Sequence, residues 1–150
     1  MELTIKTEKV LAAYRVLSTA KYGKMSDDDK IKVWKIARAM KPVATKFEDD
    51  SKDAAEKLRP YEEFQDDLQN AQEYETKKGI DCKMTIEDYQ KFMAAFKAYN
   101  KNVEKALKEF ADVEVKLTFD SISEEAFGKL MASNEWTMDQ VTTIGDMIIG

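Results

Sequence analysis

The residue types that most often carry out catalysis are scarce in this chain. Its 150 residues include no histidine and one cysteine, Cys82. Histidine is the commonest general base and a frequent zinc ligand, and a single cysteine can form neither a structural zinc site nor an internal disulfide. Because no histidine is available to activate Cys82 as a nucleophile, we interpret it as an ordinary loop thiol.

Carboxylates occur in several short runs. Runs of Asp and Glu occur at 27–29, 48–50, 62–63 and 66–67, but none has the alternating ligands and central glycine of a calcium loop. The first run is explained by helix capping and the others by solvated helix faces. Phosphate-binding and hydrolase signatures are also absent. We therefore expect no enzyme, no cofactor and no metal site, and a carboxylate–metal enzyme is the least favoured alternative.

The composition limits the kinds of partner. The chain has 24 Lys and Arg against 29 Asp and Glu, a net charge of −5, with 43% hydrophobic residues. The two signs are interleaved along the chain rather than segregated, whereas nucleic-acid binding needs clustered cations. No segment approaches the roughly 18 apolar residues that a membrane span requires. We expect a protein partner, no direct contact with nucleic acid and no membrane association.

Two short segments have the alternation of β-strands. In Glu2–Lys6, ELTIK, the apolar residues are Leu3 and Ile5, and a second alternating segment covers residues 113–119. A lone strand leaves its backbone groups unpaired, so the two segments are predicted to form a two-stranded sheet. A bare ribbon of two strands is marginal in water, so its apolar face must rest on helices.

A long helical region separates these strands. Apolar residues recur seven apart over five repeats, which predicts a helix packed lengthwise against another helix. Pro42 and Pro60 fall inside this pattern, and we expect a kink at each, or a short interruption at Pro60 without a change of direction. The repeat consists of Val33, Met40, Phe47, Ala54, Tyr61 and Leu68.

The second half of the region returns along the first. Residues 77–84 contain a glycine and predict a reversal, and residues 86–110 carry the most regular helical stripe in the chain. Its aromatic residues are interpreted as the core of an antiparallel hairpin, with a ligand groove or an oligomer seam as alternatives. Asn100 is the one polar residue in the stripe, either buried to set the register or solvated.

The C-terminal residues predict two short helices, each after a capping box, at 121–124 and 137–140. The predicted fold is therefore mostly α and forms a single domain. A coiled-coil-like hairpin, about 26–111, projects from a head formed by 1–25 and 112–150. Ile148 and Ile149 are adjacent and cannot both face inward on one short helix. We expect a candidate partner-contact patch there, with a frayed tail or core docking as alternatives. The patch comprises Trp136, Met147, Ile148 and Ile149.

In its order of elements the chain resembles a family of small tailed-phage and prophage proteins of uncharacterised function. The resemblance rests on the opening MELTIK strand, the Lys- and Ala-rich KIARAMKPVATKFEDD helix, and the VEVKLTFDSI strand with its short helical tail. It implies an accessory, assembly or structural role, in the host cytoplasm or associated with the virion. It transfers no catalytic or binding residue.

These observations lead to one functional hypothesis and its alternatives. We expect a non-enzymatic, phage-type helical protein that binds a phage structural protein or a host defence protein, with self-association into a homo-oligomer as a further alternative. The main alternative is an inhibitor of a bacterial defence system, similar to an anti-CRISPR protein, that occupies the nucleic-acid cleft of an enzyme. An assembly chaperone and a permanent virion component fit the sequence equally well.

Overall fold

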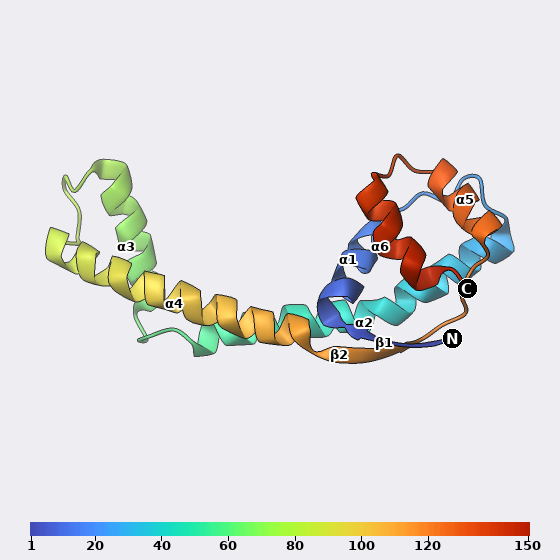
Figure 1. Ribbon diagram of the computed structural model, residues 1–150. Helices are drawn as coiled ribbons and strands as arrows, with labels where there is room; N and C mark the ends of the chain where they lie inside the picture. Colours follow the sequence, from blue (N-terminus) through green and yellow to red (C-terminus); the bar gives the residue numbers. More distant parts are fainter. The chain divides into compact units, whose positions relative to one another are not determined.

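The computed structural model describes all 150 residues as six helices and two strands (Figure 1). The mostly α fold with one small sheet, predicted from the sequence, is confirmed. In chain order the elements are β1 Glu2–Lys6, α1 Thr7–Ser18, α2 Asp27–Lys57, α3 Phe64–Lys77, α4 Ile86–Asp112, β2 Glu114–Thr118, α5 Glu124–Ala132 and α6 Met138–Ile148.

The chain divides into two compact units. Unit 1 combines Met1–Asp49 with Phe110–Gly150, and unit 2 consists of Asp50–Glu109. Helices α2 and α4 therefore each contribute residues to both units. Unit 1 takes in the first part of α2, which the sequence analysis assigned to the hairpin, because the apolar side chains of that part belong to the core of unit 1.

The two strands pair as the sequence predicted. β1 and β2 are antiparallel, with Leu3 opposite Leu117 and Ile5 opposite Val115. Leu117 is buried, whereas the alternate residues of both strands are exposed. Thr7 extends the pairing beyond the strand, since its backbone N–H and its Oγ1 hydroxyl both donate to the Val113 carbonyl oxygen at 2.8 Å. This sheet joins segments more than a hundred residues apart in sequence.

The core of unit 1 lies between this sheet and helices α1, α2, α5 and α6. The final residues close it, because the Ile122 N–H donates to the Ile148 carbonyl at 2.8 Å and the Gly150 N–H to the Ile122 carbonyl at 3.1 Å. Fully buried side chains include Val10, Leu17, Val33, Ile36, Met40, Leu130, Ile144 and Ile148.

The two prolines have different effects. Pro42 lies within α2, which continues past it. Before Pro60 the helix ends at Lys57, because proline has no N–H to donate and disfavours helical geometry in the preceding residue. Residues 58–63 interrupt the helical region at Pro60, as predicted. Helix α3 begins at Phe64 and does not continue the line of the last turns of α2, residues 50–57 of unit 2 (Figure 1). The expectation of an unchanged direction across Pro60 is wrong, although the heptad spacing itself continues in the sequence.

Helices α3 and α4 form the hairpin of unit 2. The chain reverses between them through residues with positive φ, Lys78 at 51°, Gly79 at 78° and Asp81 at 52°. Thr85 then caps α4 by accepting the Asp88 N–H on Oγ1 at 3.2 Å. The buried core of this unit is small and consists of two aromatic residues, Phe64 and Phe92, with Ala71 and Met84.

Candidate functional site: the exposed face of α2

Helix α2 has an unusual distribution of apolar residues within unit 1. Val33, Ile36 and Met40 are fully buried in the core. Ile31 and Trp34 lie on the other side of the helix and are 51% and 53% exposed. An α-helix turns by about 100° per residue, so Ile31 and Trp34 cannot reach the core that buries Val33 and Ile36. Two large apolar side chains are thus left in solvent on a helix whose opposite face is well packed.

The same face of α2 is strongly basic. The segment 30–46 contains six cationic residues and no carboxylate, although the whole chain has a net charge of −5. Lys30 forms an ion pair with Asp27 at 3.7 Å, but no ion pair involves Lys32, Lys35, Arg38 or Lys41. The six cations are Lys30, Lys32, Lys35, Arg38, Lys41 and Lys46.

The aromatic residue at the centre of this face is ordered by a cation. The Arg38 guanidinium lies over the Trp34 ring, 5.1 Å from its centroid. Such a cation–π contact contributes about 0.5–1 kcal/mol at an exposed site and reduces the freedom of both side chains. Trp34 and Arg38 therefore restrain each other on the exposed face of α2.

The helical rotation places the remaining cations on both sides of this centre. Lys32 and Lys35 lie on one flank of Ile31 and Arg38, and Lys30 and Lys41 lie on the other. The result is an apolar and aromatic centre with a cationic rim. Protein interfaces commonly have an apolar core and a polar rim.

The start of α2 is held firmly. Ser26 accepts the Asp29 N–H on Oγ at 3.2 Å, and three carboxylates follow in the first turn, Asp27, Asp28 and Asp29. Negative charge at a helix N-terminus is favoured by the helix dipole. The basic face therefore begins directly after an acidic and well-capped helix start.

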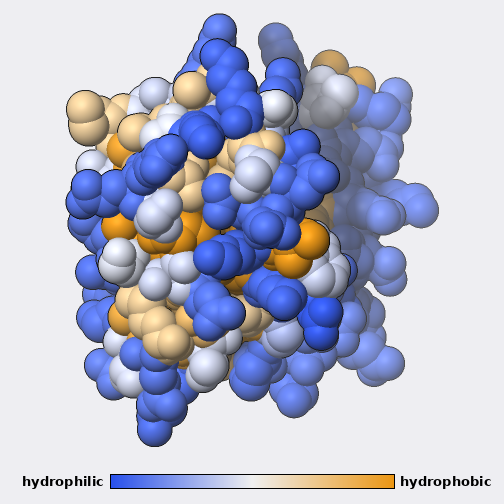
Figure 2. Space-filling model, turned by 90° about the vertical axis from the view of Figure 1, so that its right-hand side faces the viewer, coloured by the Kyte–Doolittle hydropathy of each residue, from blue (hydrophilic) through white to orange (hydrophobic).

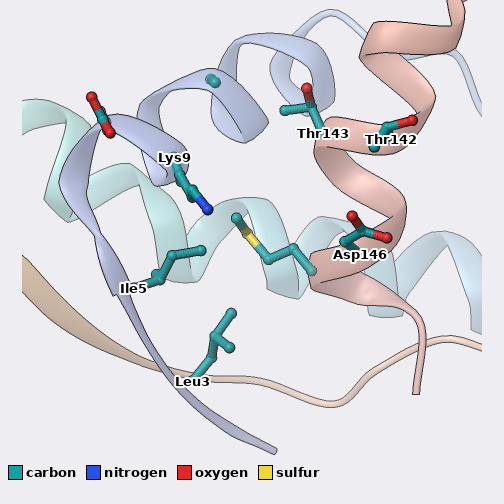
Figure 3. A pocket seen from close by; sticks show the side chains of 9 residues that line it. Leu3, Ile5, Lys9, Thr142, Thr143 and Asp146 are labelled. Carbon is teal, nitrogen blue, oxygen red and sulfur yellow. The ribbon is translucent and has the colours of Figure 1, made fainter.

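A groove in unit 1 lies between β1, α1 and α6 (Figure 3). It has a volume of about 560 Å³, within the range of small-molecule sites. Leu3, Ile5 and Met147 supply apolar side chains to its lining, and Lys9 of α1 and Asp146 of α6 line it as well. The Thr143 hydroxyl, which also lines the groove, donates to the Asp139 carbonyl oxygen of its own helix at 2.8 Å.

The residues expected to form a C-terminal contact patch are mostly used by the core. Met147 is 4% exposed and Ile148 is fully buried, while Trp136 and Ile149 are half-buried against the same core. The restriction that Ile148 and Ile149 cannot both face inward on one helix does not apply, because only Ile148 belongs to α6. Helix α6 ends at Ile148, and Ile149 has an extended backbone that bridges to Ile122. The helical geometry on which the argument depended ends between the two residues.

The other chemically active groups have structural partners in unit 2. The Cys82 thiol lies 3.4 Å from the Ile80 carbonyl oxygen in the turn before α4. Tyr89 donates to Glu75 Oε1 at 2.6 Å, and Lys77 pairs with Glu73 at 2.9 Å. The hydrogen bond that Lys77 donates to Glu73, together with the positive charge of Lys77, lowers the pKa of the Glu73 carboxyl. No group of three His, Cys, Asp or Glu side chains is arranged to hold a metal ion.

The predicted hairpin stripe is only partly covered. Asn100 is exposed, so its solvated alternative holds. Phe64 of α3 packs among the rings of α4, 5.3 Å from Phe92 and 4.8 Å from Tyr99. Tyr99 also donates its hydroxyl to the Ala55 carbonyl at 2.6 Å, which ties α4 to the end of α2 within unit 2.

Figure 2 shows one face of unit 1, where blue hydrophilic side chains surround smaller orange areas. None of the helices is both long enough and apolar enough to cross a membrane. The chain matches no family model, no curated protein and no solved structure.

The α2 face was missed in the sequence because charge was judged over the whole chain. A count confined to residues 30–46 would have found it.

Proposed function

We propose that this is a non-enzymatic interaction protein that binds a protein partner through the exposed face of α2. The observation that carries the proposal is the pair Ile31 and Trp34, each about half exposed on a helix whose opposite face is buried. Trp and Arg, together with Tyr, are the residue types enriched among the energetically dominant positions of protein interfaces. Trp34 with Arg38 stacked over it supplies both at one place.

The resemblance to small phage proteins supports an accessory, assembly or structural role. The partner would then be a phage structural protein or a host defence protein. An inhibitor that enters a nucleic-acid cleft would need an acidic contact surface, since such clefts are basic. The α2 face has the opposite charge, so it does not favour that alternative.

The test is affinity capture from lysates of infected cells with the full-length protein as bait. We expect the double variant Ile31→Ala with Trp34→Ala to lose most of the captured partner. A buried interface Trp typically contributes about 2 kcal/mol or more, which is about a 30-fold change in affinity. Met138 is 78% exposed and lies outside α2, so Met138→Ala is a matched control that should capture normally.

Equal capture by the double variant and the control would show that α2 is not the binding surface. Circular dichroism of all three proteins checks that the substitutions leave the fold intact. Retention of the fold is expected because Ile31 and Trp34 make no contribution to the buried core.

A further inference from the structure

We infer that the partner element seated on α2 is an acidic amphipathic helix, with one apolar seam and carboxylates on both sides of it. The inference rests on the proposed function and names the chemistry of the partner at the same surface. It starts from the arrangement of the α2 face, where an apolar centre is flanked by lysines on both sides.

The spacing of the central residues favours a helix as the occupant. Ile31, Trp34 and Arg38 are separated by three and four residues. Side chains at this spacing form a ridge that fits the groove between the ridges of a second helix. From Lys30 to Lys41 the face is about 16 Å long, which is about three helical turns. That length suits a short helical segment.

The lysines determine the charge of that segment. In paired helices the positions beside the apolar seam carry charges that select the partner. Lys32 and Lys35 on one flank and Lys41 on the other make no ion pair within this chain. Glu or Asp beside the seam of the incoming helix would complement them, and basic residues there would be repelled.

A nucleic acid fits the same face less well. Its phosphates form a continuous line of negative charge, and the basic face is preceded directly by the exposed carboxylates of Asp27 and Asp28. The centre of the face is also apolar at Ile31, which has nothing to offer a phosphate. An acidic protein helix can be short enough to stop before Asp27 and Asp28, and it can cover Ile31 with its own apolar seam.

The experiment uses the full chain with Trp136→Phe, which leaves Trp34 as the only tryptophan and its fluorescence as the readout. The probe is a synthetic heptad peptide with Leu at positions a and d and Glu at e and g. A second peptide has Gln in place of Glu, and single- and double-stranded DNA oligonucleotides serve as competing probes. We expect the Glu peptide to shift Trp34 emission to shorter wavelength, as burial of an exposed indole does.

A charge series on the protein sharpens the result. The variant with Lys32→Gln, Lys35→Gln and Lys41→Gln should bind the Glu peptide about tenfold more weakly, from three exposed charge pairs. The matched variant with Lys32→Arg, Lys35→Arg and Lys41→Arg keeps the charge and should bind as the parent does. Rising salt should weaken binding of the Glu peptide.

Several results would overturn the inference. They are tighter binding of DNA than of the Glu peptide, equal binding of the Gln peptide, equal affinity of the Gln variant, and no emission shift with either peptide. A shift that appears on concentrating the protein alone would assign the face to a second copy instead. None of these results alters the capture experiment with Ile31 and Trp34, so the proposed function can stand when the inference about charge fails.

Discussion

Unit 1 and unit 2 bury apolar side chains in cores of different composition and different origin in the chain. The core of unit 1 is mainly aliphatic, with side chains from β1 and α1 meeting others from β2, α5 and α6. The core of unit 2 has four buried residues, two of them phenylalanines, from one hairpin and its turn. Unit 1 thus depends on segments from both ends of the chain, whereas unit 2 is built from neighbouring segments.

The polar contacts follow the same division. In unit 1 Thr7 bonds to Val113, and the Asn134 side chain both accepts from the Lys21 N–H and donates to the Lys21 carbonyl. These partners are 106 and 113 residues apart. In unit 2 Tyr61 bonds to Asp67, only six residues away. Damage to one strand of unit 1 should therefore spread to distant helices, and damage to unit 2 should stay local.

The largest effect is expected from the apolar face of β1. The double variant Leu3→Ser with Ile5→Ser removes two side chains that pack against the core of unit 1. It should destabilise unit 1 by about 4 kcal/mol, from lost burial and added polar groups. Hydrogen exchange should quicken in α6 as well as in β1 and α1, because α6 borders the same groove (Figure 3).

The matched control is on the other face of the same strand. Glu2 and Thr4 are exposed, so Glu2→Ser with Thr4→Ser should leave exchange in α6 unchanged. Faster exchange confined to the first few residues of the Leu3 and Ile5 variant would show that the sheet does not hold the two ends of the chain together.

The next effect should be confined to unit 2. Phe64 is 2% exposed and its ring lies among those of Phe92, Phe96 and Tyr99. Phe64→Ala should cost about 3 kcal/mol because it leaves a cavity that two helices cannot fully close. Protection of amides in α3 should be lost, while α1 and α5 keep theirs. Equal loss of protection in α5 would contradict the division into two units.

The sheet was predictable from the sequence for a physical reason. Alternation in ELTIK and in residues 113–119 specifies one apolar face each, and a chain with only two such segments offers each strand a single partner. The shared apolar face limits the register to steps of two residues, and the structure adds the choice of Leu3 opposite Leu117 and Ile5 opposite Val115. The reversal before α4 was predictable from its glycine and from the cap at Thr85.

Other features could not be read from periodicity alone. The heptad repeat from Val33 to Leu68 does not reveal which partner covers each part, and in the structure Val33 and Met40 belong to one core and Leu68 packs on another. The placement of Ile149 depended on where α6 ends, and helix ends are the least certain part of a prediction. The exposed face of α2 was hidden by averaging charge over the chain.

A smaller effect is expected at Thr7, which is 5% exposed and has no solvent to replace its bond. Thr7→Val removes the hydroxyl that donates to the Val113 carbonyl but keeps the shape of the side chain. The free energy of unfolding of the variant should be lower by about 1 kcal/mol, and unit 1 should unfold faster in urea. Thr7→Ser retains the hydroxyl and should lose less. Thr118→Val, exposed on β2, is the control that should not change stability. A Thr7→Val protein as stable as the parent would show that the backbone bond from Thr7 suffices.

The smallest effect is expected at alkaline pH and concerns the ionisation of Tyr61 in unit 2. Partial burial, the 2.6 Å hydrogen bond to Asp67, and the nearby charges of Asp67 and Glu63 raise the pKa of Tyr61 from 10.0 to about 12. A raised pKa means that the folded state favours the neutral phenol. The contribution of Tyr61 to the stability of unit 2 is therefore complete below pH 10.0 and is lost as the pH rises through about 12.

Tyrosinate absorbance during an alkaline titration measures this directly. We expect Tyr61→Phe to remove the tyrosine that ionises near the upper end of the titration, and Asp67→Asn to bring its pKa back toward 10.0 because the amide keeps an acceptor but carries no charge. In unit 1 the pKa of Tyr22 is raised by burial alone, with no carboxylate involved. Asp67→Asn should therefore leave Tyr22 unchanged. If Asp67→Asn changed the pKa of Tyr22 as well as that of Tyr61, the effect of Asp67 would not be local to unit 2.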